Sequence, residues 1–314
     1  MRIGLVTDSL GHLDRESMLD ACRDLGVEAL EIGCGAWSRA PHLDLGAMLT
    51  SAAERRALLA AIERRGLELV ALNASGNPLH PGPSGAEHRR VAEAAIRLAP
   101  QLGIRRVVMM SGCPGGPGDA NANWITTAWP PETAQVLAWQ WRERVLPLWH
   151  DLAALAEAAG VRLALELHGQ QAVYNVPTLL RLRTAAGPGV GANLDPSHLM
   201  WMGAEPAAAA AALGTAIHHV HAKDTRLAPA NAALTSRLDT TPMADHAHRA
   251  WSYVTLGDGH PLAWWRDFLA ALRAAGYDDV LAIEHEDVAC PPEEGVRRSV
   301  ELLRQAMEKL DVIP

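Results

Sequence analysis

Eight short runs rich in Leu, Val, Ile and Ala recur along the chain. Most are continuously apolar rather than alternating, as expected for parallel strands that are buried on both faces. We predict strands at residues 2–8, 28–33, 67–73, 105–111, 162–168, 190–195, 217–223 and 279–285.

Segments with a helical spacing of apolar residues separate these runs. They cover residues 13–25, 51–65, 85–102, 133–159, 176–186, 262–275 and 293–310. Alternation of strands and helices around eight strands is typical of a (β/α)₈ TIM barrel. We therefore predict one domain with this fold over residues 1–314.

The connections between these elements differ in length at the two ends of the barrel. A glycine directly after a helix supplies the left-handed residue that closes it, so we expect tight helix-to-strand turns at Gly26, Gly66, Gly103, Gly160 and Gly276. The connections after the fourth and seventh strands are long, at residues 112–131 and 225–260. Both are expected on the catalytic face as binding loops.

An open doubly wound sheet is the alternative fold. Its dinucleotide-binding members carry a GxGxxG motif after the first strand. This chain has Thr7-Asp-Ser-Leu-Gly11 at that point. The barrel is therefore favoured.

Composition and charge argue against several classes of partner. The chain has 314 residues, 49% of them hydrophobic, and a formal net charge of −8. An acidic protein repels a phosphate backbone, so we expect no nucleic acid partner. No apolar stretch approaches the ~20 residues of a membrane helix, and no secretory signal is visible at the start. The four cysteines lack CxxC spacing, which fits a reducing cytoplasm.

Four acidic or imidazole side chains stand at the carboxyl ends of the last four predicted strands, namely Glu166, Asp195, His221 and Glu284. A barrel brings these strand ends into one basin. Three unpaired carboxylates would repel one another there unless a cation neutralises them. Three carboxylate oxygens and one imidazole nitrogen suit a divalent ion. We expect Mn²⁺, with Mg²⁺, Co²⁺ and Zn²⁺ as alternatives.

Two motifs make the chain resemble the xylose isomerase-like superfamily of sugar isomerases and epimerases. They are Asn193-Leu-Asp-Pro-Ser-His198 and His219-Val-His-Ala-Lys-Asp224. This superfamily of barrels includes ketose 3-epimerases, inosose dehydratases and, more distantly, endonuclease IV. The resemblance covers essentially the whole chain and implies that the four strand-end residues are metal ligands. It also implies that Glu166 and Glu284 form the acid/base pair and that His198 contacts a substrate oxygen.

The resemblance and the expected ligands together predict a carbohydrate-active enzyme. A metal that chelates a ketose carbonyl stabilises the enediolate left when a carboxylate removes the proton α to that carbonyl. Return of the proton elsewhere gives an isomer or epimer, which is the outcome we expect. If a β-leaving group departs instead, the product is an unsaturated ketone. A lyase or dehydratase acting on a 3-keto-glycoside or keto-inositol is therefore the alternative.

Three further residues are candidates at this site. His168, two residues after Glu166, is expected on the same side of its strand as an additional acid or base, or as a partner of a ligand. Lys223 is expected to face inward beside His221 and to hold a substrate oxygen or pair with a site carboxylate. Trp251, in the second long loop, is expected to bind a substrate ring by stacking.

The aromatic content bears on the size of the substrate. Ten of the fourteen aromatic residues are tryptophan, and Trp124, Trp129 and Trp201 also fall in predicted catalytic-face connections. Stacking of indoles on rings favours a substrate larger than a free monosaccharide. Trp139, Trp141 and Trp149 are expected in the core instead. Because the loop after the eighth strand is acidic, a neutral sugar is favoured over a sugar phosphate.

Two other functions and the assembly state stay open at this level. An abasic-site nuclease would need extra histidines where the third and fourth strands end in Asn73 and Ser111. A non-catalytic sugar-binding barrel would not need the paired glutamates. The sequence does not decide between a monomer, a homo-oligomer and an assembly with a second subunit.

Overall fold

The computed structural model describes residues 1–308 and 310. Eight parallel strands form a closed barrel in the order β1-β10-β7-β6-β5-β4-β3-β2. Their bounds are β1 Arg2–Val6, β2 Ala29–Gly33, β3 Glu68–Asn73, β4 Arg106–Met109, β5 Arg162–Glu166, β6 Val190–Leu194, β7 Ile217–Ala222 and β10 Val280–Ile283. The predicted single-domain (β/α)₈ barrel is therefore confirmed, although several predicted strands ran one or two residues too far.

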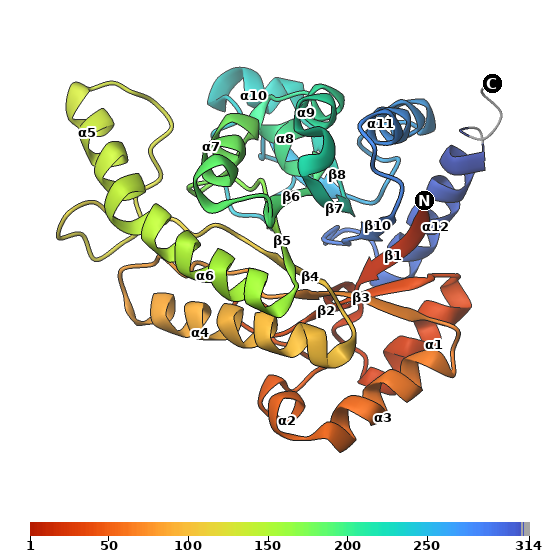
Figure 1. The fold of residues 1–314 in the computed structure, drawn as a ribbon. Coiled ribbons are helices and arrows are strands. Elements are labelled where there is room, and N and C mark those ends of the chain that lie inside the picture. The colour runs from red at the N-terminus through yellow and green to blue at the C-terminus, as the bar shows by residue number, and fades with distance from the viewer. Residues whose placement is uncertain (309, 311–314) are drawn as a thin grey trace.

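Helices surround these strands on the outside of the barrel (Figure 1). The long ones are α1 Arg15–Leu25, α3 Ala52–Glu63, α4 Pro83–Leu98, α5 Pro131–Gln140, α6 Leu146–Ala159, α7 Val176–Ala186, α11 Leu262–Ala274 and α12 Pro292–Glu308. A π-helical turn, Trp141–Val145, joins α5 to α6, so the predicted helix over 133–159 is nearly continuous. In the predicted helix over 293–310, Lys309 lies outside the described residues.

Four short helices were not predicted: α2 Leu45–Thr50, α8 Pro196–Met202, α9 Pro206–Leu213 and α10 Pro229–Thr235. Each spans only one or two turns, too few for an apolar period to stand out. Tight turns at the predicted glycines are present. Gly160, for example, has a φ of 65° and its N–H bonds back to the last turn of α6, a conformation that costs glycine little.

The connection over 225–260 is not a plain loop as expected. It contains most of an antiparallel pair, β8 Asp224–Leu227 and β9 Trp251–Val254, with α10 between the two strands. Thr225 pairs with Tyr253 and Leu227 with Trp251. Because the partners are separated by more than twenty residues, no short hairpin turn announces the pairing. The earlier connection, over 112–131, is irregular as predicted.

The barrel separates a large outer core from a small inner one. Outward-facing residues such as Leu5, Leu30 and Ile32 join the helices in one extensive buried cluster. Inside the barrel, the clusters are small and consist mostly of Ala and Val. Small inner side chains leave room for buried polar groups, among them Glu31, Arg106 and His219.

Among residues 1–308 and 310, no helix has the length and apolar character needed to cross a bilayer.

Two of the three tryptophans expected in the core, Trp141 and Trp149, are fully buried, whereas Trp139 is half-buried.

Trp149 ties α6 to the barrel, and its loss is expected to destabilise the fold. Its ring is fully buried and its Nε1–H donates to the carbonyl of Ser111, 3.0 Å away. Replacement by Ala leaves a cavity and an unpaired carbonyl, so the free energy of unfolding should fall by about 3–5 kcal/mol in denaturant titrations. Trp129→Ala is the control, because that ring is 74% exposed. Equal losses in both variants would contradict this account.

Candidate metal centre

The carboxyl ends of four neighbouring strands meet at one side of the barrel mouth. Glu166 is the last residue of β5, Asp195 follows β6, His221 lies near the end of β7, and Glu284 follows β10. His221 is in register with Ala282, so Glu284 stands one inward position further along. Strand register therefore brings together residues that are up to 118 positions apart.

These four side chains converge as the sequence predicts. One ligand atom from each can be chosen so that all four atoms lie within 4.8 Å of one another. Three of the side chains are buried, and that of Glu284 is 19% exposed. A single cation at bonding distance from all four atoms is compatible with this spacing.

Two atoms of the set are buried without a partner. Asp195 caps α8 with one oxygen, since Oδ1 accepts from the Ser197 N–H at 2.8 Å. Its Oδ2 and the Nδ1 of His221 have no hydrogen-bond partner among the described residues. Buried polar atoms are rarely left unsatisfied. His221 Nδ1 lies 3.5 Å from Glu284 Oε2 and 3.9 Å from Glu166 Oε2, so the residues present fit a divalent ion.

The carboxylates differ in how readily they ionise. Burial, and then the charge of Glu284, raises the pKa of Glu166 well above its usual range. Burial likewise raises the pKa of Asp195 to about 6. Burial also opposes the charge on Glu284, but Lys223 and His221 lower its pKa below the usual range. The surroundings thus shift the pKa values of Glu166 and Glu284 in opposite directions.

Lys223 is the cation of the site and is 3% exposed. Its Nζ donates to Glu284 Oε2 at 2.6 Å and to Glu286 Oε2 at 2.8 Å, and lies 3.6 Å from Asp195 Oδ2. Burial opposes its charge, but the surrounding carboxylates raise its pKa well above the ordinary value. Both alternatives predicted for Lys223 require an inward orientation, and it has one, paired with site carboxylates.

His198 lies between Glu166 and the antiparallel pair. Its Nε2 is 2.6 Å from Glu166 Oε1, and its Nδ1 is 2.9 Å from the hydroxyl of Tyr253 on β9. Burial, followed by the charges of His168 and Lys223, lowers the pKa of His198 well below its usual value. Both ring nitrogens are engaged by the protein, so the contact of His198 with a substrate oxygen stays a prediction.

His168 packs against His198, with ring centroids 4.1 Å apart. Its Nδ1 bonds the carbonyl of Gly169. A carbonyl only accepts, so Nδ1 carries the proton and Nε2 of the neutral ring is the basic nitrogen. Burial lowers the pKa of His168. A neutral imidazole whose basic nitrogen is Nε2 thus stands beside the four-residue set.

Trp251 lies further out, 8% exposed, and stacks on Trp201 with ring centroids 4.8 Å apart. Together with Trp124, Tyr253 and His168 these rings line a pocket of about 570 Å³. The indole N–H groups of Trp124 and Trp201 have no hydrogen-bond partner in the described part of the chain. The pocket therefore offers aromatic surface, and two of the indoles that line it carry buried donors without a partner.

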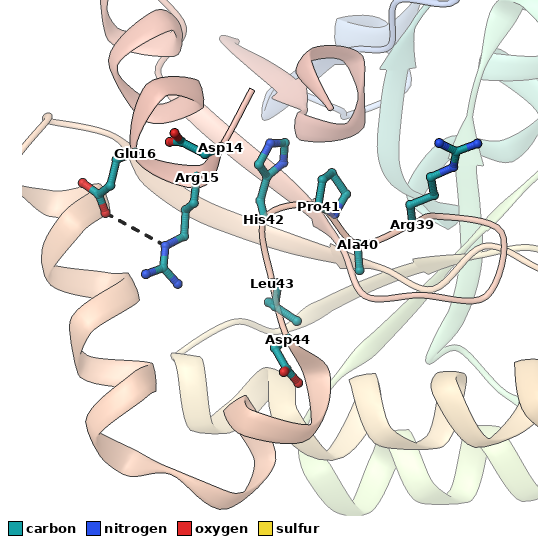
Figure 2. Close-up of a pocket in the computed structure, with 9 residues that line it drawn as sticks. All are labelled: Asp14, Arg15, Glu16, Arg39, Ala40, Pro41, His42, Leu43 and Asp44. Carbon is teal, nitrogen blue, oxygen red and sulfur yellow. Dashed lines mark ion pairs between the residues drawn. The ribbon is translucent and has the colours of Figure 1, made fainter. Parts of the chain in front are cut away.

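Two other cavities lie near the barrel mouth. One of about 190 Å³ is lined by Glu166, Glu284 and Glu286 together with Trp37. A second, of about 740 Å³, lies between the start of α1 and the segment before α2, and Figure 2 shows its lining residues from Asp14 to Asp44. Figure 2 includes none of the four strand-end residues. The smaller cavity is thus the one that opens onto the candidate centre.

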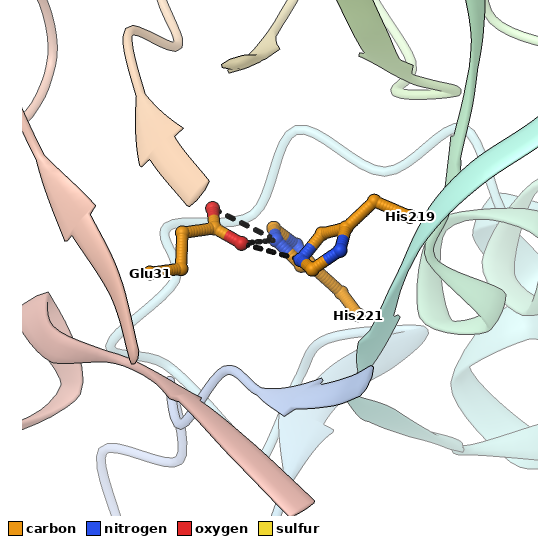
Figure 3. Close-up of side chains that lie close together, drawn as sticks. All are labelled: Glu31, His219 and His221. Atoms are coloured by element: carbon orange, nitrogen blue, oxygen red, sulfur yellow. Dashed lines mark hydrogen bonds and ion pairs between the residues drawn. The ribbon is translucent and has the colours of Figure 1, made fainter. Parts of the chain in front are cut away.

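Three residues of the site were not found from the sequence: Glu31, Tyr253 and Glu286. Glu31 was treated as part of an apolar strand, yet it is the one charged residue in Ala29–Gly33, and that was the available signal. It contacts His221 from the barrel interior (Figure 3). Tyr253 reaches the site only through the unpredicted pairing of β8 and β9.

Comparison with known proteins decides the family. The model of the xylose isomerase-like TIM barrel family matches residues 19–306. The chain belongs to this family. The protein YfiH of Bacillus subtilis (strain 168) is 47% identical over 313 residues, which covers 98% of this chain and 100% of YfiH. The resemblance seen in the two motifs is confirmed.

Solved structures share the fold at lower identity. The IolI protein with a bound zinc atom is 18% identical with a TM-score of 0.68, over 98% of this chain and 99% of that one. A D-tagatose 3-epimerase-like protein is 20% identical with a TM-score of 0.67, over 99% and 98%. The probable 3-DHS dehydratase AsbF from Bacillus anthracis is 17% identical with a TM-score of 0.67, over 97% and 99%. At these identities the likeness concerns the xylose isomerase-like fold alone.

Asp195→Asn should separate the structural role of this residue from cation binding. Asn still caps α8 but brings no negative charge to the four-residue set. Mn²⁺ at about 100 times its Kd should stabilise the wild-type protein by about 2.7 kcal/mol, and the variant by much less. Calorimetric melting with and without Mn²⁺ measures both.

Asp287→Asn is the matched control for that measurement. Asp287 is a buried carboxylate whose partners are Thr255 and Ala289, outside the four-residue set. It should keep the full Mn²⁺-induced shift. An unchanged shift in Asp195→Asn would count against the metal centre.

Proposed function

We propose that this protein is a divalent-metal-dependent isomerase or epimerase that removes the proton α to the carbonyl of a sugar or keto-sugar. The observation that carries the proposal is the convergence of Glu166, Asp195, His221 and Glu284, with two of their buried atoms lacking partners. Three carboxylates and one imidazole are a donor set for a hard or borderline cation. We propose Mn²⁺, with Mg²⁺, Co²⁺ and Zn²⁺ as alternatives.

The four residues would hold the ion, and further groups would position the substrate. When bound, the ion supplies Lewis-acid stabilisation of the negative charge that develops on the carbonyl oxygen. Lys223 Nζ lies between Glu284 and Glu286, where it could also donate to a substrate oxygen. The cavity of about 190 Å³ beside Glu166 and Glu284 would hold the reacting part of the substrate.

Glu284 and Glu166 are proposed as the groups that move the proton. Two carboxylates whose pKa values are pushed apart by their surroundings are suited to opposite roles in proton transfer. Glu284, kept ionised by Lys223, would accept the α-proton. Glu166, whose raised pKa allows it to hold a proton, would return one. The hydrogen bond from His198 Nε2 would orient the carboxyl group of Glu166.

A lyase or dehydratase is the second candidate, and His168 favours it. The basic Nε2 of His168 could take the α-proton in place of a carboxylate, because Nδ1 holds the ring proton. The Lys223 ammonium could then protonate the departing group. The shared fold with a probable dehydratase is compatible with this outcome.

We further propose that the substrate has a second ring, bound in the pocket of Trp124, Trp201 and Trp251. The pocket of about 570 Å³ is lined by His168 and that of about 190 Å³ by Glu166, two residues earlier, and the two volumes together exceed what a free monosaccharide needs. Indole rings bind the apolar faces of sugar and aryl rings. A neutral glycoside handled in the cytoplasm fits these surroundings.

Glu284→Gln is expected to abolish exchange of the substrate α-hydrogen with solvent. Removing a general base typically costs about 10²- to 10⁴-fold in rate. The assay incubates Mn²⁺-loaded protein in deuterated water with free ketoses, 3-keto-glucosides and inososes, and follows the label by NMR. Metal content is measured in parallel, because loss of the ion would mimic loss of the base.

Glu286→Gln is the matched control, since Glu286 pairs with the same lysine but is outside the converging set. It should lower the exchange rate by less than about tenfold. Retained exchange in fully loaded Glu284→Gln would rule out its role as base. Label without new absorbance indicates an isomerase or epimerase, whereas an ultraviolet-absorbing enone indicates the lyase.

Trp251→Ala should weaken binding of an aryl glycoside much more than binding of a free sugar. Loss of one stacked ring is expected to raise the KM for the glycoside roughly tenfold. Trp129→Ala removes an exposed ring and should change neither the KM for the glycoside nor the KM for the free sugar. A parallel rise for both substrates in Trp251→Ala would argue that the second ring does not lie in this pocket.

A further inference from the structure

A buried carboxylate lies on the far side of His221 from the metal centre. Glu31, on β2, is fully buried inside the barrel, and Figure 3 shows it facing His219 and His221. Both of its oxygens are 3.1 Å from His221 Nε2. Its Oε2 is also 2.7 Å from His219 Nε2. These three side chains could be taken for a second metal site.

The hydrogen bonds around His219 argue against a second ion. The Arg106 guanidinium can only donate, and its Nη1 is 3.0 Å from His219 Nδ1. Nδ1 is therefore an acceptor, and the ring proton of the neutral histidine is on Nε2. That proton points at Glu31. Neither nitrogen of His219 has a lone pair free for a metal.

Glu31 is surrounded by donors. Asn73 Nδ2 donates to Oε1 at 2.6 Å, and the Asn73 amide is oriented by its own oxygen, which accepts from the Ser75 N–H. His219 donates to Oε2. An ionised carboxylate offers only acceptors, so the remaining neighbour, His221 Nε2, must donate as well.

This fixes the other nitrogen of His221. A metal ion binds an imidazole nitrogen only when that nitrogen carries no proton, so His221 in the metal-loaded protein keeps one ring proton, which Glu31 holds on Nε2. The lone pair of Nδ1 then faces the centre, with Glu284 Oε2 at 3.5 Å and Glu166 Oε2 at 3.9 Å. A metal-binding histidine commonly has such a carboxylate on its second nitrogen, which sets the tautomer and strengthens the ligand.

We propose that Glu31 is a positioning residue that holds His221 with Nδ1 available to the metal ion. Glu31 touches neither the ion nor the substrate and acts through His221. The line from Asp279 through Arg106 and His219 orients Glu31 in turn, since Arg106 Nη2 is 2.6 Å from Asp279 Oδ2. This inference rests on the proposed metal centre, because the orientation of His221 matters only if a metal ion binds at Nδ1.

Glu31→Gln tests the proposal with a change of one atom type. The glutamine side chain replaces one acceptor oxygen of Glu31 with an NH₂ group, which donates and whose neighbours are donors too. This NH₂ group finds an acceptor only if His221 Nε2 gives up its proton and accepts. The ring proton then moves to Nδ1 and blocks the metal position. The Kd for Mn²⁺, measured by competition with a chelator, should rise by about 10- to 100-fold. Glu31→Asp keeps an acceptor-only group and should bind Mn²⁺ more tightly than Glu31→Gln.

Asp287→Asn controls for a general loss of stability. The Mn²⁺ affinity of Asp287→Asn should stay within about twofold of wild type even if its melting temperature falls, because the partners of Asp287 are outside the centre. The role of Glu31 is overturned if Glu31→Gln binds Mn²⁺ as tightly as wild type. Wild-type protein that binds no Mn²⁺ would instead overturn the metal centre itself.

A measurement on the wild-type protein covers the case in which Glu31→Gln does not fold. The imidazole nitrogens of the Zn²⁺-loaded protein can be distinguished by their ¹⁵N chemical shifts. His221 should show a protonated Nε2 and a metal-bound Nδ1. The reverse pattern would overturn the proposal.

Discussion

Repulsion between buried carboxylates is the constraint on which the rest of this structure depends. Glu166, Asp195 and Glu284 are held within a few ångströms of one another at the barrel mouth. In such surroundings like charges repel far more strongly than in water. Lys223 and His221 offset part of this charge, and Glu284 is the carboxylate they favour. Burial first, and then the charge of Glu284, raise the pKa of Glu166 and of Asp195, and a divalent cation would relieve both effects.

The fold restrains each of the four side chains through a partner outside the four-residue set. Asp195 is held by the start of α8, Glu166 by His198, Glu284 by Lys223, and His221 by Glu31. These partners come from strand ends, from the first turn of a helix and from the barrel interior. Small residues inside the barrel make the last of these possible. The arrangement therefore depends on inner packing as much as on the loops.

Sequence patterns predict what is local or periodic. The eight strands follow from their apolar runs, and the four strand-end residues follow from the topology, since consecutive parallel strands end side by side. Glu31 was missed because its partners are 188 and 190 residues further along the chain, so only the inner layering of the barrel reveals the contact. Tyr253 was missed because its strand pairs across a long insertion. Which atom of each residue is engaged is likewise a property of the packed structure.

The row of contacts from His221 to Asp279 runs through the interior of the barrel. Asp279 immediately precedes β10 at the amino-terminal end of the strands, and its side chain is 40% exposed to solvent. In barrels of this type that end is ordinarily associated with stability and the opposite end with chemistry. Here a solvent-accessible carboxylate is connected by hydrogen bonds to the candidate metal centre. The two ends of the barrel are therefore coupled electrostatically through this row of hydrogen bonds.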